Sequence, residues 1–160
     1  MRVSAKADYA IRALVEIAAR QPVDGSPLPV KGDAIASAQD IPMKFCENIL
    51  SELREAGIVS SRRGSEGGYW LAIPAPDIRL GDVIRVVEGP LAAVRGERPN
   101  DVVFTGTSAP LQAVWVATRA ALRRVLDAVT IADVVSGDLP PVVAELLRDD
   151  GAWVAVRIPG

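Results

Sequence analysis

Apolar residues recur along the start of the chain at the three- and four-residue spacing of amphipathic helices. The first such stripe predicts a helix over residues 4–20, with Ser4 placed to cap its start. A loop rich in proline and glycine follows, and a short helix resumes at Gly32 or Asp33 and continues to Ala38. The members of the first stripe are Ala7, Ala10, Ile11, Leu14, Ile17 and Ala18.

A third helix is predicted over residues 42–56, because Pro42 suits the first turn of a helix and Gly57 ends it. Two runs of strand-forming residues then flank a glycine-rich turn at 63–68, which indicates a β-hairpin. Two short helices joined by a tight turn and followed by a hairpin are typical of a winged helix-turn-helix. The buried stripe of the third helix is predicted to consist of Phe45, Cys46, Ile49, Leu50 and Leu53.

The second half of the chain predicts a mainly α architecture. A short helix ends at Gly89-Pro90, a loop without periodicity follows, and a long helix then leads to Thr130 and Asp133, which resemble a capping box. Four segments are therefore expected. They are a winged helix-turn-helix domain at 1–76, a short helix and mobile loop at 77–107, a dimerisation helix with a following short helix at 108–136, and a peripheral segment at 137–160.

The long helix carries the most extended apolar pattern in the sequence. Its continuous seam is widened by neighbouring alanines, so the helix has more apolar surface than one small winged domain can bury. We therefore expect a homodimer in which this helix packs against a second copy. The expected interface residues are Leu111, Val114, Trp115, Leu122, Val125 and Leu126.

Composition excludes most catalytic and metal chemistry. The 160 residues are 49% hydrophobic and 24% charged, which fits one globular domain with an appended arm. Histidine is absent and Cys46 is the only cysteine, which removes Ser-His and Cys-His nucleophile pairs, tetrahedral zinc sites and four-thiolate clusters from a single chain. The acidic pair Asp149 and Asp150 is best interpreted as part of a solvated tail. We expect no enzyme activity and no metal site.

The sequence shows no sign of export or membrane insertion. Charged residues interrupt the first twenty positions, where a signal peptide would need an apolar run. The apolar run at 152–156 is far shorter than the roughly 20 residues that span a bilayer. We therefore expect a cytoplasmic protein with no membrane partner.

The exposed face of the third helix carries side chains suited to base recognition. Lys44, Glu47, Asn48 and Ser51 follow one another at helical spacing opposite the buried stripe. Glu47 can accept from a cytosine amino group, Asn48 can pair with adenine, and Lys44 can reach guanine or a phosphate. The same pattern also fits an ordinary solvated helix face.

The hairpin tip places two guanidinium groups beside a glycine. Arg62 and Arg63 directly precede Gly64, which suits contact with phosphates or the minor groove, although surface arginines on an ordinary turn would look alike. Basic and acidic residues balance one another in residues 1–68, and the whole chain has net charge −2. DNA binding therefore requires the cations to converge on one surface. Those expected to do so are Arg2, Lys6, Lys44, Arg62 and Arg63.

Four segments carry a resemblance to a known family. They are MRVSAKADYA at 1–10, LREAGIV at 53–59, RGSEGGY at 63–69, and GDVI at 81–84 leading to EGP at 88–90. Over about 1–136 the chain resembles the IscR/CymR family of bacterial winged-helix transcription regulators. The resemblance implies a homodimer whose long helices pair and whose winged domains read a palindromic operator. It also implies that Lys44 and Glu47 read bases and that Arg63 and Gly64 contact DNA at the wing tip.

The sequence departs from that family in two places. Members that sense iron–sulfur status or nitric oxide carry three cysteines between the Glu-Gly-Pro segment and the long helix, and here the interval 91–108 has none. We therefore expect no iron–sulfur cluster, as in the cluster-free branch, where a metabolite, a partner protein or a thiol modulates repression. Pro42 stands where members often have a small hydroxyl residue, so the operator sequence does not carry over.

The sequence thus predicts a cytoplasmic, dimeric, sequence-specific DNA-binding regulator that acts as a repressor. Its expected partners are double-stranded DNA, a second copy of the chain, and an effector metabolite or protein. The alternative is a winged-helix module that docks on a metabolic enzyme without reading DNA. Cys46 is expected to be an inert core thiol, with a redox switch as the alternative.

Overall fold

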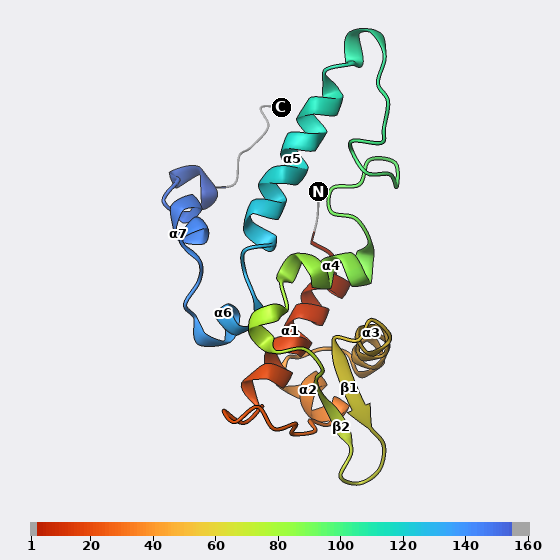
Figure 1. Ribbon diagram of the computed structural model, residues 1–160, viewed down its shortest axis with the longest axis vertical. Coiled ribbons are helices and arrows are strands. Elements are labelled where there is room, and N and C mark those ends of the chain that lie inside the picture. Colours follow the sequence, from red (N-terminus) through yellow and green to blue (C-terminus); the bar gives the residue numbers. More distant parts are fainter. Residues whose placement is uncertain (1–2, 155–160) are drawn as a thin grey trace.

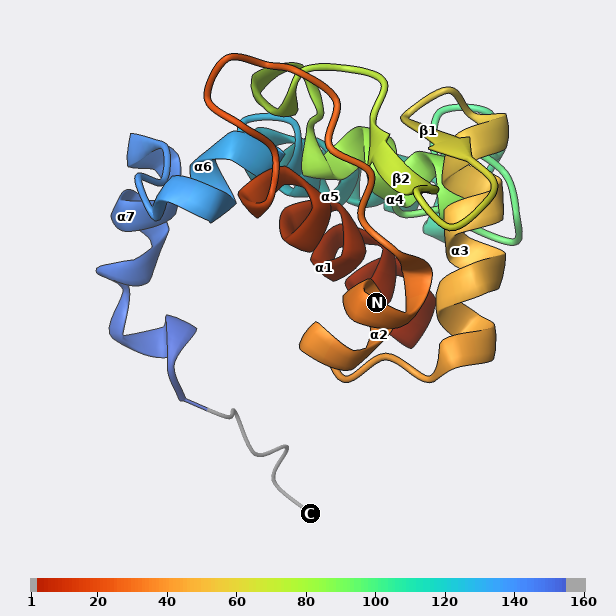
Figure 2. The same cartoon turned by 90° about the horizontal axis from the view of Figure 1, so that it is seen from below.

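The computed structural model describes residues 3–154 and is mainly helical, with one two-stranded antiparallel sheet (Figures 1 and 2). Short 3₁₀ turns at Ala75–Asp77, Gly106–Ser108 and Asp150–Ala152 connect the longer elements. The main elements are α1 (Ala5–Ala19), α2 (Gly32–Ala38), α3 (Met43–Glu55), β1 (Val59–Arg62), β2 (Gly68–Leu71), α4 (Leu80–Glu88), α5 (Leu111–Leu126), α6 (Ile131–Ser136) and α7 (Pro141–Leu147). The prediction of a mainly α fold with a hairpin wing is confirmed.

Helix α1 is the centre of the winged domain, and α3, α4 and α6 all pack against it. Its start is capped as predicted, because the Ala7 amide donates to the Ser4 hydroxyl at 3.1 Å. Most of its apolar face is buried, and Ile11 and Ala18 at the edge of that face are half-buried. Burial of this face stabilises the packing of the surrounding helices. The buried residues of α1 are Ala7, Ala10, Ala13, Leu14 and Ile17.

The turn between α2 and α3 fixes the angle at which α3 leaves the core. Asp40 adopts φ 50, and the Ile41 amide donates to the Ala36 carbonyl at 2.9 Å, which closes the turn. Ile41 itself is buried, so the turn is anchored from inside. Pro42 is the N-cap residue that precedes α3, rather than a member of its first turn.

The buried face of α3 is narrower than predicted. Cys46, Ile49, Leu50 and Leu53 are buried, but the prediction for Phe45 is wrong, since this side chain is 56% exposed. Phe45 lies at the edge of the buried stripe of α3, beside Tyr9 of α1. Its ring forms a T-shaped pair with Tyr9, with centroids 6.4 Å apart, and this contact leaves most of the Phe45 side chain in solvent.

The wing is attached to the helices by backbone hydrogen bonds. Val59 pairs with Leu71 and Arg62 with Gly68, and beyond the hairpin Val30 and Tyr69 exchange two hydrogen bonds of 2.8 Å each. The chain that leads into α2 therefore forms a single antiparallel bridge with β2. This contact fixes the wing next to the start of α2.

Gly68 should be essential for that attachment. Its φ is +152°, and a Cβ there would lie 2.6 Å from the Val30 carbonyl oxygen. We expect Gly68→Ala to cost more than about 1 kcal/mol of unfolding free energy, because both the backbone angle and the close approach disfavour a side chain. Gly64→Ala is the matched control, since Gly64 also has positive φ but has open space around it. Thermal unfolding that gives equal losses for the two variants would contradict this role of Gly68.

Helix α5 stands apart from the winged domain (Figure 1). It begins at Leu111 after a loop whose regular structure is limited to a 3₁₀ turn and a bridge between Val94 and Glu97. No residue of α5 is buried within the described chain. The chain that follows returns to the core through the buried residues Val129 and Ile131, and the predicted capping box at Thr130 is present.

Helix α4 connects the winged domain to the loop that leads to α5. Val83, Ile84 and Val87 are buried against α1 and α3. The Leu80 amide donates to the Val129 carbonyl at 3.0 Å, which ties the start of α4 to the segment after α5. Within residues 3–154 no helix is long and apolar enough to cross a bilayer.

Candidate nucleic-acid interface

Three of the four predicted base-reading residues are exposed on one face of α3. Lys44, Glu47 and Asn48 point away from the core, while Ser51 is half-buried. Ser51 takes part in a local network, in which its hydroxyl donates to Glu55 and accepts from Arg54, both at 3.4 Å. Within residues 3–154, the polar side chains in the N-terminal half of α3 form no side-chain hydrogen bond or ion pair. This is the half that enters the major groove in helix-turn-helix proteins.

A basic concavity lies between α2, the end of α3 and the wing. We call it the wing cleft; it has a volume of about 450 Å³, and no acidic side chain lines it in the described part of the chain. Within residues 3–154, its four cations form no ion pair. They are Lys31, Arg54, Arg62 and Arg63. The two predicted wing arginines are therefore brought together with two further cations.

Lys31 and Arg54 were not predicted as site residues. Lys31 is the N-cap residue of α2, and Arg54 lies in the last turn of α3. In the sequence they are separated from the wing and from each other, and only the pairing of Val30 with Tyr69 brings Lys31 to the hairpin. Because the first helix of a helix-turn-helix crosses the DNA backbone, Lys31 at the start of α2 could have been predicted as a phosphate contact.

The wing tip holds its two arginines differently. The Arg62 guanidinium donates to the Glu66 carbonyl at 3.0 Å, so this side chain is held along the turn. Arg63 and Gly64 are exposed, and Gly64 has φ +105° with open space around it. The backbone at Gly64 can therefore approach another molecule closely, with the Arg63 charge beside it.

The structure separates Lys6 from the wing cleft. Lys6 forms an ion pair with Glu52 of α3 at 2.8 Å and does not line the cleft. Arg2, the other predicted cation, lies outside the described residues. Phe45, on the other hand, is exposed at the start of α3 beside Lys44, where an apolar ring can contact a thymine methyl group. A contact between Phe45 and DNA was not predicted from the sequence, because the apolar pattern placed Phe45 in the buried stripe of the helix.

Cys46 lies in the core, as expected. Its side chain is fully buried, and its sulfur is 3.9 Å from the Gly32 carbonyl. Burial raises the pKa of the Cys46 thiol, and the neighbouring charge of Glu47 raises it further. The thiol is therefore protonated near neutral pH, which disfavours the thiolate needed for redox chemistry.

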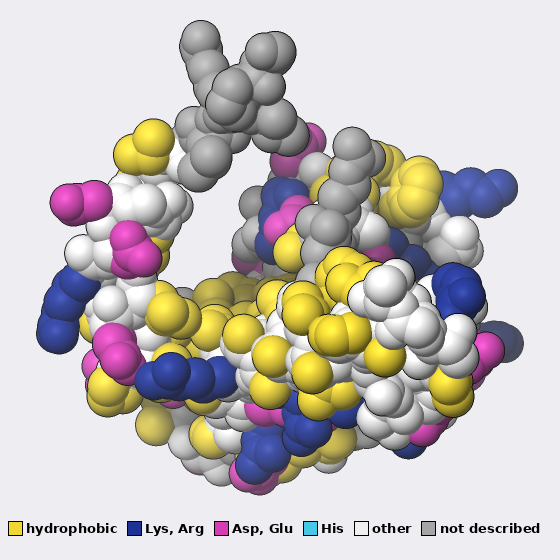
Figure 3. Space-filling model, turned by 90° about the horizontal axis from the view of Figure 1, so that it is seen from above, with side chains coloured by type: hydrophobic (Ala, Val, Ile, Leu, Met, Phe, Trp, Pro, Cys, Tyr) yellow, Lys and Arg dark blue, Asp and Glu magenta, His cyan; other side chains and the backbone are white. Residues whose placement is uncertain are grey.

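The residues expected at a dimer interface fall into two groups. Leu111, Val114 and Trp115 are exposed by 41%, 51% and 37%, whereas Leu122, Val125 and Leu126 are half-buried. Leu122 and Leu126 line an apolar cleft of about 210 Å³ against α1 and α4. Seen from the end where α5 projects, hydrophobic side chains gather across the middle of the molecule (Figure 3).

Comparisons with known proteins identify one family. The model of the Rrf2 family, described as an iron-dependent transcriptional regulator, matches residues 3–137. A helix-turn-helix-type transcriptional regulator of Mycobacterium tuberculosis is 45% identical over 98% of this chain and 95% of its own length. Among solved structures, Bacillus subtilis CymR, the global cysteine regulator of that organism, has a TM-score of 0.69 and 32% identity, covering 85% of this chain and 97% of its own. IscR of T. potens has a TM-score of 0.64 and 30% identity, covering 98% and 94%.

The iron in the family description does not fit the donor set of this chain. The interval 91–108 contains neither cysteine nor histidine, and Cys46 is buried in the core. Within residues 3–154 no three His, Cys, Asp or Glu side chains lie close enough to hold a metal ion. We therefore assign no step of its action to iron.

The fold, the basic cleft and the comparisons agree on one class of protein. The relatives that match over most of the chain are transcriptional regulators and not enzymes, and the alternative of an enzyme-docking module is not favoured. DNA binding follows from the same family. The chain belongs to the Rrf2 family of winged helix-turn-helix transcriptional regulators.

Proposed function

We propose that the protein is a cytoplasmic, homodimeric repressor that recognises a palindromic operator. The observation that carries the proposal is the wing cleft, where four cations without an ion-pair partner in residues 3–154 lie next to the exposed face of α3. Cations gathered in this way suit a polyanion, even though the chain as a whole is slightly acidic.

In this proposal the wing cleft and the exposed face of α3 contact different parts of the DNA. The four cleft cations contact phosphates, which sets the position of the protein on the duplex and supplies sequence-independent affinity. Lys44, Glu47 and Asn48 enter the major groove and contact base edges, with Phe45 available for a thymine methyl group. Glu47 is the most selective of these, because a carboxylate next to a polyanion is unfavourable unless a base amino group donates to it.

In a homodimer, the second copy supplies a second α3 helix and a second wing cleft. Helix α5 leaves Leu111, Val114 and Trp115 exposed in a single chain, and an apolar surface of this kind favours association with another chain. A two-fold dimer places its two α3 helices in major grooves about one or two helical turns apart. The operator should then be palindromic, and a bound dimer would block access of the transcription machinery.

The purified protein should be colourless. A cluster would need several thiolate or imidazole ligands, and one chain offers a single buried cysteine and no histidine. Anaerobically purified protein is expected to lack visible absorbance and to contain iron and sulfide far below one equivalent per chain. Stoichiometric iron and sulfide would show that this expectation is wrong.

Fluorescence anisotropy tests the proposal with duplex DNA from the region upstream of the protein's own gene. The expected result is binding at least about a thousandfold tighter than to a shuffled duplex of equal length at the same salt concentration. Arg54→Gln should weaken binding to both duplexes, while Arg148→Gln, which removes an exposed charge that does not line the cleft, should leave both unchanged. Equal affinity for the native and shuffled duplexes would contradict operator recognition at this site.

A further inference from the structure

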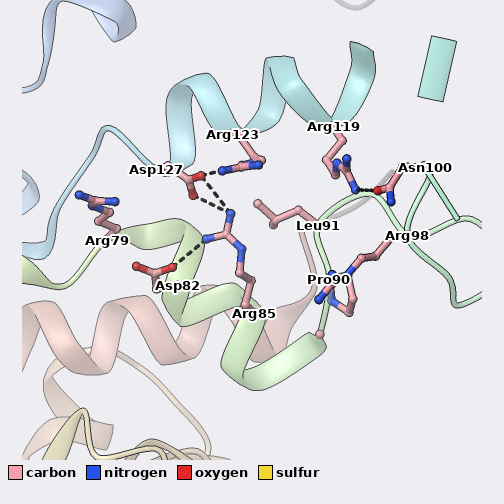
Figure 4. Close-up of a pocket in the computed structure, with 11 residues that line it drawn as sticks. Arg79, Asp82, Arg85, Pro90, Leu91, Arg98, Asn100, Arg119, Arg123 and Asp127 are labelled. Carbon is pink, nitrogen blue, oxygen red and sulfur yellow. Dashed lines mark hydrogen bonds and ion pairs between the residues drawn. The ribbon is translucent and has the colours of Figure 1, made fainter. Parts of the chain in front are cut away.

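A second basic cavity lies at the joint between α4, the loop after it and α5 (Figure 4). We call it the arginine pocket; its volume is about 620 Å³, which is in the range of metabolite sites. Five arginines and two aspartates line it, so positive charges outnumber negative ones by three. Its charged residues are Arg79, Asp82, Arg85, Arg98, Arg119, Arg123 and Asp127.

The two aspartates neutralise one side of the pocket. Asp127 accepts hydrogen bonds from Arg85 at 2.8 and 3.0 Å and from Arg123 at 3.0 Å, and Arg85 also donates to Asp82 at 2.8 Å. Burial would raise the pKa of Asp127, but the hydrogen bonds and charges of Arg123 and Arg85 outweigh it and lower that pKa. Asp127 is therefore ionised and engaged at neutral pH.

The remaining cations have no such partner. Within residues 3–154, Arg79, Arg98 and Arg119 form no ion pair with a carboxylate. The Arg119 guanidinium donates to the Asn100 side-chain oxygen at 2.7 Å, a contact that orients the group without neutralising it. Figure 4 shows Arg98, from the loop, and Arg119, from α5, at the same end of the pocket.

We infer that the arginine pocket binds a small oxyanion with at least two negative charges and that this anion is the effector of the regulator. Guanidinium groups recognise carboxylate and phosphoryl oxygens through paired hydrogen bonds. Within the described chain no carboxylate forms an ion pair with Arg98 or Arg119, so both can bind the oxygens of a ligand. The ligand is therefore a polycarboxylate or a phosphorylated metabolite, two chemistries that share this mode of recognition.

The position of the pocket connects the ligand to DNA binding. Helix α4 packs on α3, which reads the DNA, while α5 carries the expected dimer surface. An anion held by Arg98 on the loop and Arg119 on α5 would fix the position of the loop and of α5 relative to α4. This changes the distance between the two α3 helices of a dimer and with it the operator affinity. The regulatory step rests on the proposed function, whereas anion binding does not.

Isothermal titration calorimetry on the full chain tests the binding step. The probes are citrate, succinate, inorganic phosphate and fructose 1,6-bisphosphate, each at constant ionic strength with chloride as the reference. Saturable binding of a carboxylate or of a phosphoryl probe is expected and decides between the two chemistries. Failure of all four probes to bind at millimolar concentration would overturn the inference.

Substitutions locate the bound anion. Arg119→Gln and, separately, Arg98→Gln are expected to weaken probe binding by at least about tenfold. Arg148→Gln is the matched control, because it removes an exposed arginine outside the pocket and should leave binding unchanged. Arg98 lies on an exposed loop, so we expect Arg98→Gln to leave the stability of the fold unchanged. This variant therefore tests anion binding even if Arg119→Gln lowers the melting temperature. Undiminished binding in the Arg98→Gln variant would place the anion elsewhere and contradict the inference.

Operator binding with and without the bound probe separates the two claims. A severalfold change in operator affinity that is lost in Arg119→Gln supports an effector site. Saturable anion binding with unchanged operator affinity overturns the regulatory step and leaves an anion site. A protein that binds the anion but no duplex DNA would refute the proposed function while leaving the pocket assignment intact.

Discussion

Val114→Asp is expected to convert the homodimer into folded monomers and to abolish tight operator binding. Val114 is 51% exposed in the single chain, so a charge there costs the monomer little. In a dimer the same carboxylate would lie unpaired in an apolar interface, where burial of an uncompensated charge is strongly unfavourable. We expect the dimer dissociation constant to rise by at least about a hundredfold, or about 3 kcal/mol.

Sedimentation equilibrium measures that change directly. Ala120→Asp is the control, because Ala120 is exposed on the same helix but lies on the face opposite to Leu111, Val114 and Trp115. Thermal unfolding of both variants should show that the monomer fold survives. A Val114→Asp protein that remains dimeric at micromolar concentration would show that the interface lies elsewhere.

Arg63→Ala and Glu47→Ala should affect DNA binding in opposite ways. Arg63 is exposed at the wing tip without an ion pair in the described chain, so its loss should weaken binding to every sequence and reduce the salt dependence by about one phosphate contact. Glu47→Ala should leave non-specific binding equal or stronger. It should also relax discrimination at one base pair in each half-site by roughly 1–3 kcal/mol.

Competition binding against a panel of operator variants tests this division. Asp138→Ala is the matched control for Glu47→Ala, because it removes one exposed carboxylate between α6 and α7, outside α3, and corrects for the change in net charge. A loss that is uniform across the panel for Glu47→Ala would mean that this residue supports the fold of α3 and does not read a base.

Local pattern was sufficient to predict the helices and the wing. The stripe of α1, the capping box at Thr130 and the glycine-rich hairpin each depend on residues close together in the sequence. Phe45 shows the limit of that information. The width of a buried helical stripe depends on which neighbouring helices cover it, and α1 covers only the edge of this ring.

The charged sites depend on tertiary contacts that spacing does not reveal. Lys31 joins the wing cleft only because Val30 pairs with Tyr69, and Lys6 is partly neutralised only because α1 packs beside Glu52. The arginine pocket combines α4 with a loop of irregular structure and with α5. The exposed face of α3, which we predict to read bases, could be identified from the sequence because it depends on the spacing of residues within one helix.

Selection from a random pool of duplex DNA tests the central claim most directly, since it assumes no operator in advance. The account predicts enrichment of a palindrome whose two half-sites are centred about one or two helical turns apart, and loss of that enrichment in Val114→Asp. Enrichment of an isolated half-site, or no enrichment at a salt concentration where the duplex is still bound, would contradict a dimer that reads DNA through α3.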